Sequence, residues 1–445
     1  MTNIVETFRN AFKIPELRAK LIFTMIILLL YRFGTAVPVP FIDPKGLSEL
    51  FAQAGDSIFG MINILSGDAF SSATLFALGI SPYITSSIVM QLLSIAVPAL
   101  EKLQKSGEEG RKKITQITRY LTVGLGLITG FGYYMTCRAN GIVLDQGNVL
   151  FVGIVIVSCY TAGSCLIMWL GERINENGIG NGISMILFAN IISTLPSWFI
   201  RLIVQIIDST TAAEAIMQIV RAAVFIAAGI ATLAFVVFFS NAERRVPVQY
   251  SKRMVGRKMY GGQSSHLPMK VNMSGVMPII FASSMVSVPA TILGFVNASP
   301  EHGSIAWHIT RLFAPSSPLY MALNFALIIA FSYFYISISF NPIEVSNNLK
   351  KNGGFIPGIR PGKPTTDYIT KILHKIVLIG GLFLGVVAVF PLVANAIISL
   401  INQTWALGAI AFAGSSLLIV VGVALETTRE IEAQMTMRHY KGFLE

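Results

Sequence analysis

The chain has 445 residues, of which 53% are hydrophobic and only 12% are charged, and its formal net charge is +11. Because an ordinary soluble domain carries about 25% charged residues, this composition excludes a soluble globular protein and predicts a bundle of membrane helices. The three cysteines, Cys137, Cys159 and Cys165, lie in or beside apolar segments, lack metal-ligand spacing and are odd in number. We interpret them as small apolar side chains, and we expect neither a disulfide framework nor a bound metal or cofactor.

Apolar runs of about 20 residues, each able to cross a hydrocarbon layer of about 30 Å, recur along the whole chain. Residues 1–20 form an amphipathic stretch before the first run, and no cleavable signal peptide is apparent. We expect ten spans, near residues 21–40, 74–97, 119–137, 149–170, 183–204, 217–240, 273–296, 318–340, 372–397 and 405–425.

Lys and Arg indicate how these spans are oriented. Most of the 33 basic residues lie in the amino terminus, in the carboxyl-terminal tail and in the segments after spans 2, 4, 6 and 8. The positive-inside rule therefore places both termini in the cytoplasm, in agreement with an even number of spans. Five spans per half invert the second half relative to the first, as in an inverted repeat. We expect an N-terminal half at 1–205 and a C-terminal half at 206–445.

The connection between the first two spans contains an apolar piece, Ile58–Leu65, that is too short to cross a membrane. Gly55, Gly60 and Gly67 would let it bend. One interpretation is a short helix at about 56–68 that plugs a pore from the outer side, and the other is an interfacial loop helix. The apolar side chains of the predicted plug are Ile58, Phe59, Met61, Ile62 and Leu65.

Two long loops, 241–272 and 341–371, are more basic than topology requires. The alternation at Val246–Tyr250 predicts a strand, and Gly256 would allow a hairpin. The loops are either ordinary positive-inside loops or, as we prefer, a docking face for an RNA-rich or acidic cytosolic partner. The predicted docking residues are Arg244, Arg245, Lys252, Arg253, Arg257, Lys258, Lys350, Lys351, Arg360 and Lys363.

Two glycine-rich motifs resemble nucleotide sites without their context. GIGNG (178–182) has no surrounding βαβ unit, and GIRPGKPT (358–365) has Pro364 where a phosphate loop needs Ser or Thr. The spans carry almost no carboxylate or His, and Arg32 is the clearest charge within one of them. Proton- or sodium-coupled transporters normally need ionisable groups at mid-membrane. The chain is therefore predicted not to be an enzyme, and a secondary transporter for small solutes with inverted repeats remains the alternative.

Six long stretches carry a family resemblance: ALGISPYITSSIVMQLL, SGEEGRKKITQITRY, WLGERINENGIGNGIS, HLPMKVNMSGVMPIIFASS, NNLKKNGGFIPGIRPGKPT and GSSLLIVVGVALE. In these the chain resembles bacterial members of the SecY family of protein-translocation channels over essentially its full length. The resemblance implies an all-α hourglass pore of two inverted five-helix halves in the bacterial inner membrane. Its implied function is to pass unfolded, signal-bearing polypeptides across the membrane and to release membrane segments laterally into lipid.

The resemblance also implies roles for particular residues and partners. A ring of aliphatic side chains would close the waist, and a lateral gate would lie between spans 2 and 3 on one side and spans 7 and 8 on the other. The ring would comprise Ile80, Ile84, Ile183, Leu187, Ile280 and Ile419, and the polar residues near the gate are Thr85, Gln91, Asn272 and Ser284. Implied partners are the ribosome, the SecA ATPase, small membrane subunits resembling SecE and SecG, signal sequences, the polypeptide in transit and membrane lipid.

Overall fold

The computed structural model describes residues 4–53, 63, 66–144, 148–207, 212–250, 253–255, 258–260, 264–296, 305–314, 317–401 and 408–441. Long helices dominate this part of the chain, which confirms the predicted all-α class. They are α2 (Pro15–Gly34), α5 (Ser81–Ala96), α7 (Glu108–Ala139), α8 (Val149–Asn177), α9 (Gly182–Ile207), α10 (Ala212–Ser240), α11 (Met277–Val296), α13 (Pro318–Ser339), α15 (Lys363–Ile401) and α16 (Gly408–Lys441). Each of the ten expected spans overlaps one of these helices.

Within the described residues, five shorter helices lie between or before them: α1 (Ile4–Lys13), α3 (Pro44–Gln53), α6 (Pro98–Lys105), α12 (Ile305–Leu312) and α14 (Pro342–Lys351). By length and hydropathy, four described helical stretches qualify as membrane spans on their own: Val149–Asn177, Ala215–Ser240, Pro318–Lys351 and Lys363–Ala394. The pair α5 and α6 would make a fifth, although a bend of 101° separates its parts. That bend follows from Pro98, which forces the preceding Val97 into an extended conformation (φ −107°, ψ 113°).

Several helix ends differ from the expected spans for reasons of local chemistry. Helix α2, which corresponds to the first expected span, ends at Gly34 and not near residue 40, because Pro38 and Pro40 follow and residues 37–39 pair with residues 73–75 in an extended bridge. Helix α5, which corresponds to the second expected span, begins at Ser81 and not near residue 74, because Gly79 adopts a positive φ of 56° shortly before it. The expected boundary at 205/206 falls in the last turn of α9, which ends at Ile207.

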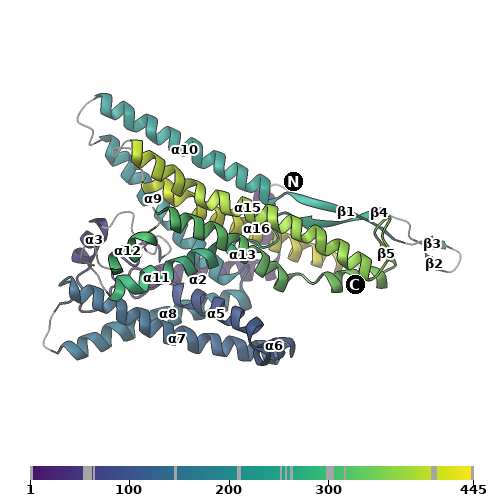
Figure 1. The fold of residues 1–445 in the computed structure, drawn as a ribbon, viewed down its shortest axis with the longest axis horizontal. Helices are drawn as coiled ribbons and strands as arrows, with labels where there is room; N and C mark the ends of the chain where they lie inside the picture. The colour runs from purple at the N-terminus through teal and green to yellow at the C-terminus, as the bar shows by residue number, and fades with distance from the viewer. Residues whose placement is uncertain are drawn as a thin grey trace.

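The described strands of the two basic loops form a small three-stranded sheet and a separate two-stranded sheet outside the helices. Strand β1 (Glu243–Tyr250) pairs antiparallel with β4 (Ser264–Lys270), from Glu243 opposite Lys270 to Gln249 opposite Ser264. This confirms the strand predicted at Val246–Tyr250. Between them, β2 (Arg253–Val255) pairs with β3 (Lys258–Tyr260) on either side of the expected turn. Strands β1 and β4 extend away from one end of the helices (Figure 1).

The second basic loop joins the same sheet through a two-residue strand. Gln249 and Tyr250 of β1 pair with Phe355 and Gly354 of β5 (Gly354–Phe355), giving the strand order β4-β1-β5. Residues more than 100 positions apart therefore meet at one surface. Neither loop is an independent excursion from the bundle.

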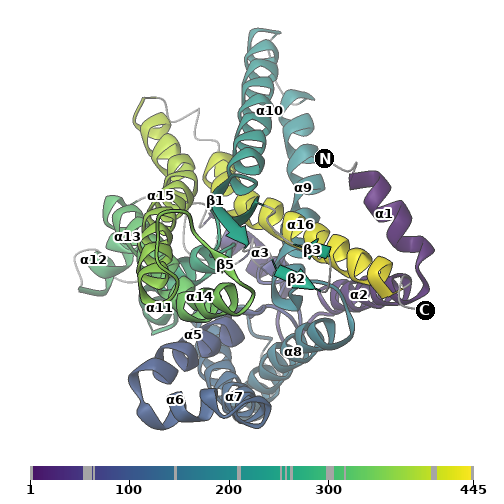
Figure 2. The same cartoon turned by 90° about the vertical axis from the view of Figure 1, so that its right-hand side faces the viewer.

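The helices of the two halves meet along one interface. Helix α11 packs against α5 and α7, and also against α13, while α13 packs against α15. Helix α16 packs against α9, α10 and α15, so it contacts helices of both halves. Viewed from the sheet end, α5–α8 lie below, α11, α13 and α15 lie to the left, and α16 crosses the middle (Figure 2). The largest apolar core lies where these helices converge.

Candidate pore constriction

The first two candidate ring residues lie at the start of α5. Ile80 is the residue before the helix, Pro82 lies in its first turn, and the amide of Ile84 donates to the carbonyl of Ile80 at 3.0 Å. The i,i+4 spacing predicted that both side chains share one face. Both are buried, with exposed fractions of 4% and 5%.

A tight turn before α9 positions the next two. The Asn181 side chain caps the helix by accepting from the amides of Ile183 and Ser184, at 3.1 and 3.4 Å. Gly182 lies so close to the Gly171 carbonyl of α8 that no Cβ would fit between the two backbones. Leu187 is 2% exposed, whereas Ile183 is only partly buried against the same core.

The last two candidates come from the second half. Ile280 lies on α11 and Ile419 on α16, with exposed fractions of 5% and 4%. Gly422 of α16 faces the side chain of Val276, the residue before α11, and a Cβ at Gly422 would overlap it. Ile280 and Ile419 line the same cavity.

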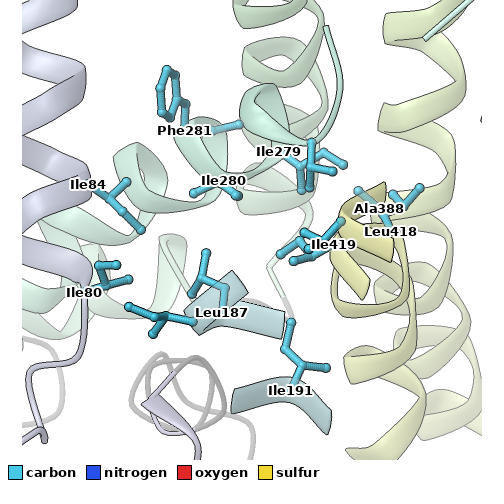
Figure 3. Close-up of a cluster of buried hydrophobic side chains, with 14 of the residues drawn as sticks. Ile80, Ile84, Leu187, Ile191, Ile279, Ile280, Phe281, Ala388, Leu418 and Ile419 are labelled. Atoms are coloured by element: carbon cyan, nitrogen blue, oxygen red, sulfur yellow. The ribbon is translucent and has the colours of Figure 1, made fainter. Parts of the chain in front are cut away.

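Five of the six predicted ring residues line a single cavity: Ile80, Ile84, Leu187, Ile280 and Ile419. Figure 3 shows these side chains extending from separate helices toward a common space. Ile183 does not line the cavity. The arrangement therefore brings together aliphatic groups from α5, α9, α11 and α16, that is, from both halves of the chain.

Hydroxyl groups complete the wall of this cavity. Besides Leu78 and Gly79, its lining includes Ser66, Ser81, Ser283, Ser284 and Ser415, and among the described residues none that lines it is ionisable. Of these serines, sequence reasoning had named only Ser284. The pair Ser283–Ser284 and the pair Ser415–Ser416, each inside an apolar helix, were the available signal.

The polar residues predicted near the lateral gate do not form a cluster. Gln91 donates to Ser87 of its own helix at 3.2 Å, and Asn272 precedes α11 by several residues. Among the described residues, no hydrogen bond joins Thr85, Gln91, Asn272 and Ser284 across the interface between α5 and α11. Only Ser284 lies at the cavity.

The predicted plug residues Ile58, Phe59, Met61, Ile62 and Leu65 lie outside the described residues. The turn that follows them is held firmly by the first half. The Arg32 guanidinium donates to the Gly67 carbonyl at 3.4 Å, and the Tyr133 hydroxyl donates to the Phe70 carbonyl at 2.7 Å. Phe70 also packs edge-on against Tyr133, with ring centroids 4.8 Å apart. Arg32, the clearest charge within a predicted span, thus contacts a backbone carbonyl beside the cavity.

The candidate docking residues lie on and around the small sheet. Arg244 and Arg245 are exposed on β1, where Arg245 contacts Glu243 at 2.7 Å. Lys350, Lys351, Arg360 and Lys363 are exposed around β5. Lys252 and Arg257 lie outside the described residues, and Arg253 and Lys258 are described only as members of β2 and β3. The pairing of β1 with β5 brings the two basic groups to one end of the molecule.

Known proteins of the same architecture are channels. A sequence model of the SecY family matches residues 74–428. The protein translocase subunit SecY of Streptomyces coelicolor is 44% identical to this chain and covers 99% of it over its own full length. SecY of Corynebacterium glutamicum is 40% identical, with 100% of both chains covered.

Solved structures show the same fold. A protein-conducting channel aligns with a TM-score of 0.65 and 18% identity, covering 96% of each chain. Sec61 in a canine ribosome-channel complex from the endoplasmic reticulum aligns with a TM-score of 0.60 and 16% identity, again over 96% of each chain. Nothing in these comparisons favours a solute transporter, and the family consists of translocation channels and not of enzymes. The chain belongs to the SecY family of protein translocase subunits.

Proposed function

We propose that this chain forms the channel through which unfolded, signal-bearing polypeptides cross the bacterial inner membrane and from which membrane segments enter lipid. The observation that carries the proposal is the cavity where aliphatic side chains from α5, α9, α11 and α16 converge. A site formed by helices of both halves, whose described lining is aliphatic side chains, serines and a glycine, suits a passage.

The aliphatic ring provides the seal. A narrow apolar constriction excludes water, so ions would lose their hydration without gaining ligands. Branched aliphatic side chains make many weak, non-directional contacts, so they can yield around peptides of varied sequence. The serine hydroxyls beside the ring offer hydrogen bonds to backbone groups that have just left it, since such groups must be satisfied within a membrane.

The lateral exit runs between α5 and α7 on one side and α11 and α13 on the other. A segment of about 20 apolar residues in the channel is better solvated by hydrocarbon than by water. Hydrogen bonds between membrane helices contribute only about 0.6–2 kcal/mol. A gate closed mainly by apolar packing between α11 and its neighbours can therefore open when such a segment binds. Ser284, at the cavity edge, is the polar residue we retain for this gate.

The short apolar segment Ile58–Leu65 acts in this proposal as a displaceable plug on the outer side. Both termini and the small sheet face the cytoplasm, because most Lys and Arg residues lie on that side. The sheet docks the ribosome or the SecA ATPase, and SecE-like and SecG-like subunits complete the channel. Ribosome contact is supported by the fold shared with Sec61 of the canine ribosome-channel complex and with the yeast Ssh1 complex bound to the 80S ribosome (TM-score 0.57, 15% identity).

Disulfide crosslinking tests the ring. Single cysteines replace each of the six ring residues in a background without the three native cysteines, and a secretory chain with one cysteine is arrested in transit. We expect crosslinks from Ile80, Ile84, Leu187, Ile280 and Ile419. Exposed positions on the same helices, Val89, Ile192 and Ile292, serve as matched controls and should not react. Equal crosslinking of ring and control positions would refute the assignment.

A further inference from the structure

The carboxyl-terminal part of α16, beyond Ile419, contacts both the base of the small sheet and the turn before α9. On one side, Arg429 donates through Nη2 to the Ser240 carbonyl at 3.1 Å and to the Asn241 side-chain oxygen at 2.8 Å. Asn241 lies between α10 and β1, and the amide of Val271 donates to the Ala242 carbonyl at 2.9 Å. Arg429 is therefore bonded to the base of the β1–β4 hairpin, where the hairpin leaves the helices.

On the other side, the neighbouring residue of α16 is bonded to the first half. The Glu430 carboxylate accepts from the amide of Gly180 at 2.9 Å and is itself held by Gln434 at 3.1 Å. Ile431 is fully buried in the same apolar cluster as Ile179. The 178–182 turn leads directly into α9, which carries Ile183 and Leu187 on its first two turns.

Charged side chains of both signs are concentrated where α16 meets the hairpin base. Lys270 is opposite Glu243 at the hairpin base, and burial followed by the charge of Arg429 lowers the pKa of its ammonium group. Burial, and then the nearby Glu430, raises the pKa of Glu426. Like charges, Arg429 with Lys270 and Glu430 with Glu426, are thus brought close together where α16 meets the hairpin base.

The same helix reaches the constriction. Ile419 and Arg429 both lie within α16, and at 1.5 Å per residue they are about 15 Å apart along its axis. A displacement of the hairpin base that moves Arg429 must therefore move Ile419 or bend the helix. Through Glu430 the same displacement reaches the 178–182 turn and Leu187.

We propose that Arg429 and Glu430 are positioning residues that couple the base of the cytoplasmic hairpin to the pore ring through α16. The role of the hairpin as a docking surface and the role of the ring as a seal are those of the proposed function, on which this inference rests. The coupling itself is a property of the contacts and acts with or without a bound partner. It gives the physical connection that coupling between distant sites requires.

The first experiment uses no partner. Cysteine replaces Ile419 or Leu187 in a background without native cysteines, and its rate of modification by a water-soluble maleimide is measured in proteoliposomes. Arg429→Gln removes the guanidinium group, and Asn241→Ala removes one of its two acceptors. Each variant should change the rate of cysteine modification about 2- to 30-fold, the range measured for coupling between distant sites. Arg429→Lys keeps one donor and should restore most of the wild-type rate.

The control is Arg173→Gln, which breaks an exposed ion pair of 2.6 Å within α8 and touches neither α16 nor the hairpin. It should leave the rate unchanged. Wild-type rates in both Arg429→Gln and Asn241→Ala would refute the coupling. The two variants remove opposite ends of the hydrogen bond between Arg429 and Asn241. If one of them fails to fold, the other still tests the coupling.

A second measurement adds bacterial ribosomes that carry no nascent chain. They should change the modification rate of wild-type protein, and Arg429→Gln should still bind them in co-sedimentation but lose the change. If ribosomes leave the wild-type rate unchanged while Arg429→Gln alters it without them, the coupling holds and the docking proposal is wrong. If Arg429→Gln loses ribosome binding, Arg429 belongs to the docking surface and the coupling proposal is overturned.

Discussion

Gly182→Ala should loosen the pore ring from a position that contributes no side chain to it. A Cβ at this position would overlap the Gly171 carbonyl oxygen, an atom of the α8 backbone that cannot rotate away. The two helices must therefore separate locally. Overpacking of this kind typically destabilises a protein by about 1–3 kcal/mol. Because Ile183 follows immediately and Leu187 lies one turn later, part of that displacement reaches the constriction.

The matched control is Gly124→Ala in α7, where a Cβ would meet nothing within 4 Å. Removing an unneeded helical glycine should stabilise by roughly 0.5–1 kcal/mol, so the two substitutions should have opposite effects. Thermal unfolding in detergent, followed by the reaction of buried Cys137 with a thiol-reactive dye, measures stability. Planar-bilayer conductance without substrate measures the seal.

We expect Gly182→Ala to lower the unfolding midpoint and to raise the resting conductance, and Gly124→Ala to do neither. If both substitutions gave the same midpoint and the same conductance, the close approach of α8 and α9 would not position the ring. A lower unfolding midpoint with unchanged conductance would show that the overlap destabilises the packing of α8 against α9 without reaching the ring, and would refute the effect on the seal.

Three further predictions concern other parts of the molecule. Arg360→Glu should abolish secretion at normal membrane levels, because it reverses charge on an exposed surface; normal motor-driven translocation would contradict this. Deleting Ile58–Leu65 should raise ion leakage without stopping translocation, and an unchanged single-channel current would make the segment a passive loop. Tyr133→Phe should lower the free energy of unfolding by about 0.5–1.5 kcal/mol, since it removes the hydrogen bond to the Phe70 carbonyl; an unchanged unfolding midpoint would contradict it.

Hydropathy located the helices but not their ends. Apolar content continues past Gly34 and begins before Ser81, so a window of about 20 residues includes segments that are not helical. Proline and a positive-φ glycine set those ends, through local sterics to which hydropathy is blind. The strand at Val246–Tyr250 was predictable because a period of two differs from any helical period.

The constriction was harder to predict because periodicity shows which residues share a face but not which faces meet. The resemblance supplied Ile80, Ile84, Leu187, Ile280 and Ile419, and the cavity brings these five together. The neighbouring serines were missed, since isolated hydroxyls in membrane helices are also common in ordinary helix packing. Arg429 was missed because basic residues near a terminus were interpreted as a topology signal alone.

The position of the ring couples its two proposed activities. Ile80 and Ile84 lie at the start of α5 and Ile280 lies on α11, and these two helices pack against each other at the proposed lateral exit. Any separation of α5 from α11 that opens the lateral exit also moves these isoleucines apart, so exit and seal cannot be controlled independently at this level.

Leu187 and Ile419 lie on helices outside that interface, and their contacts to the hairpin base run through α16. The ring is thus divided into a part that follows the proposed lateral exit and a part that follows the hairpin base. A passing chain or a displaceable segment must restore the seal whenever only one part has moved.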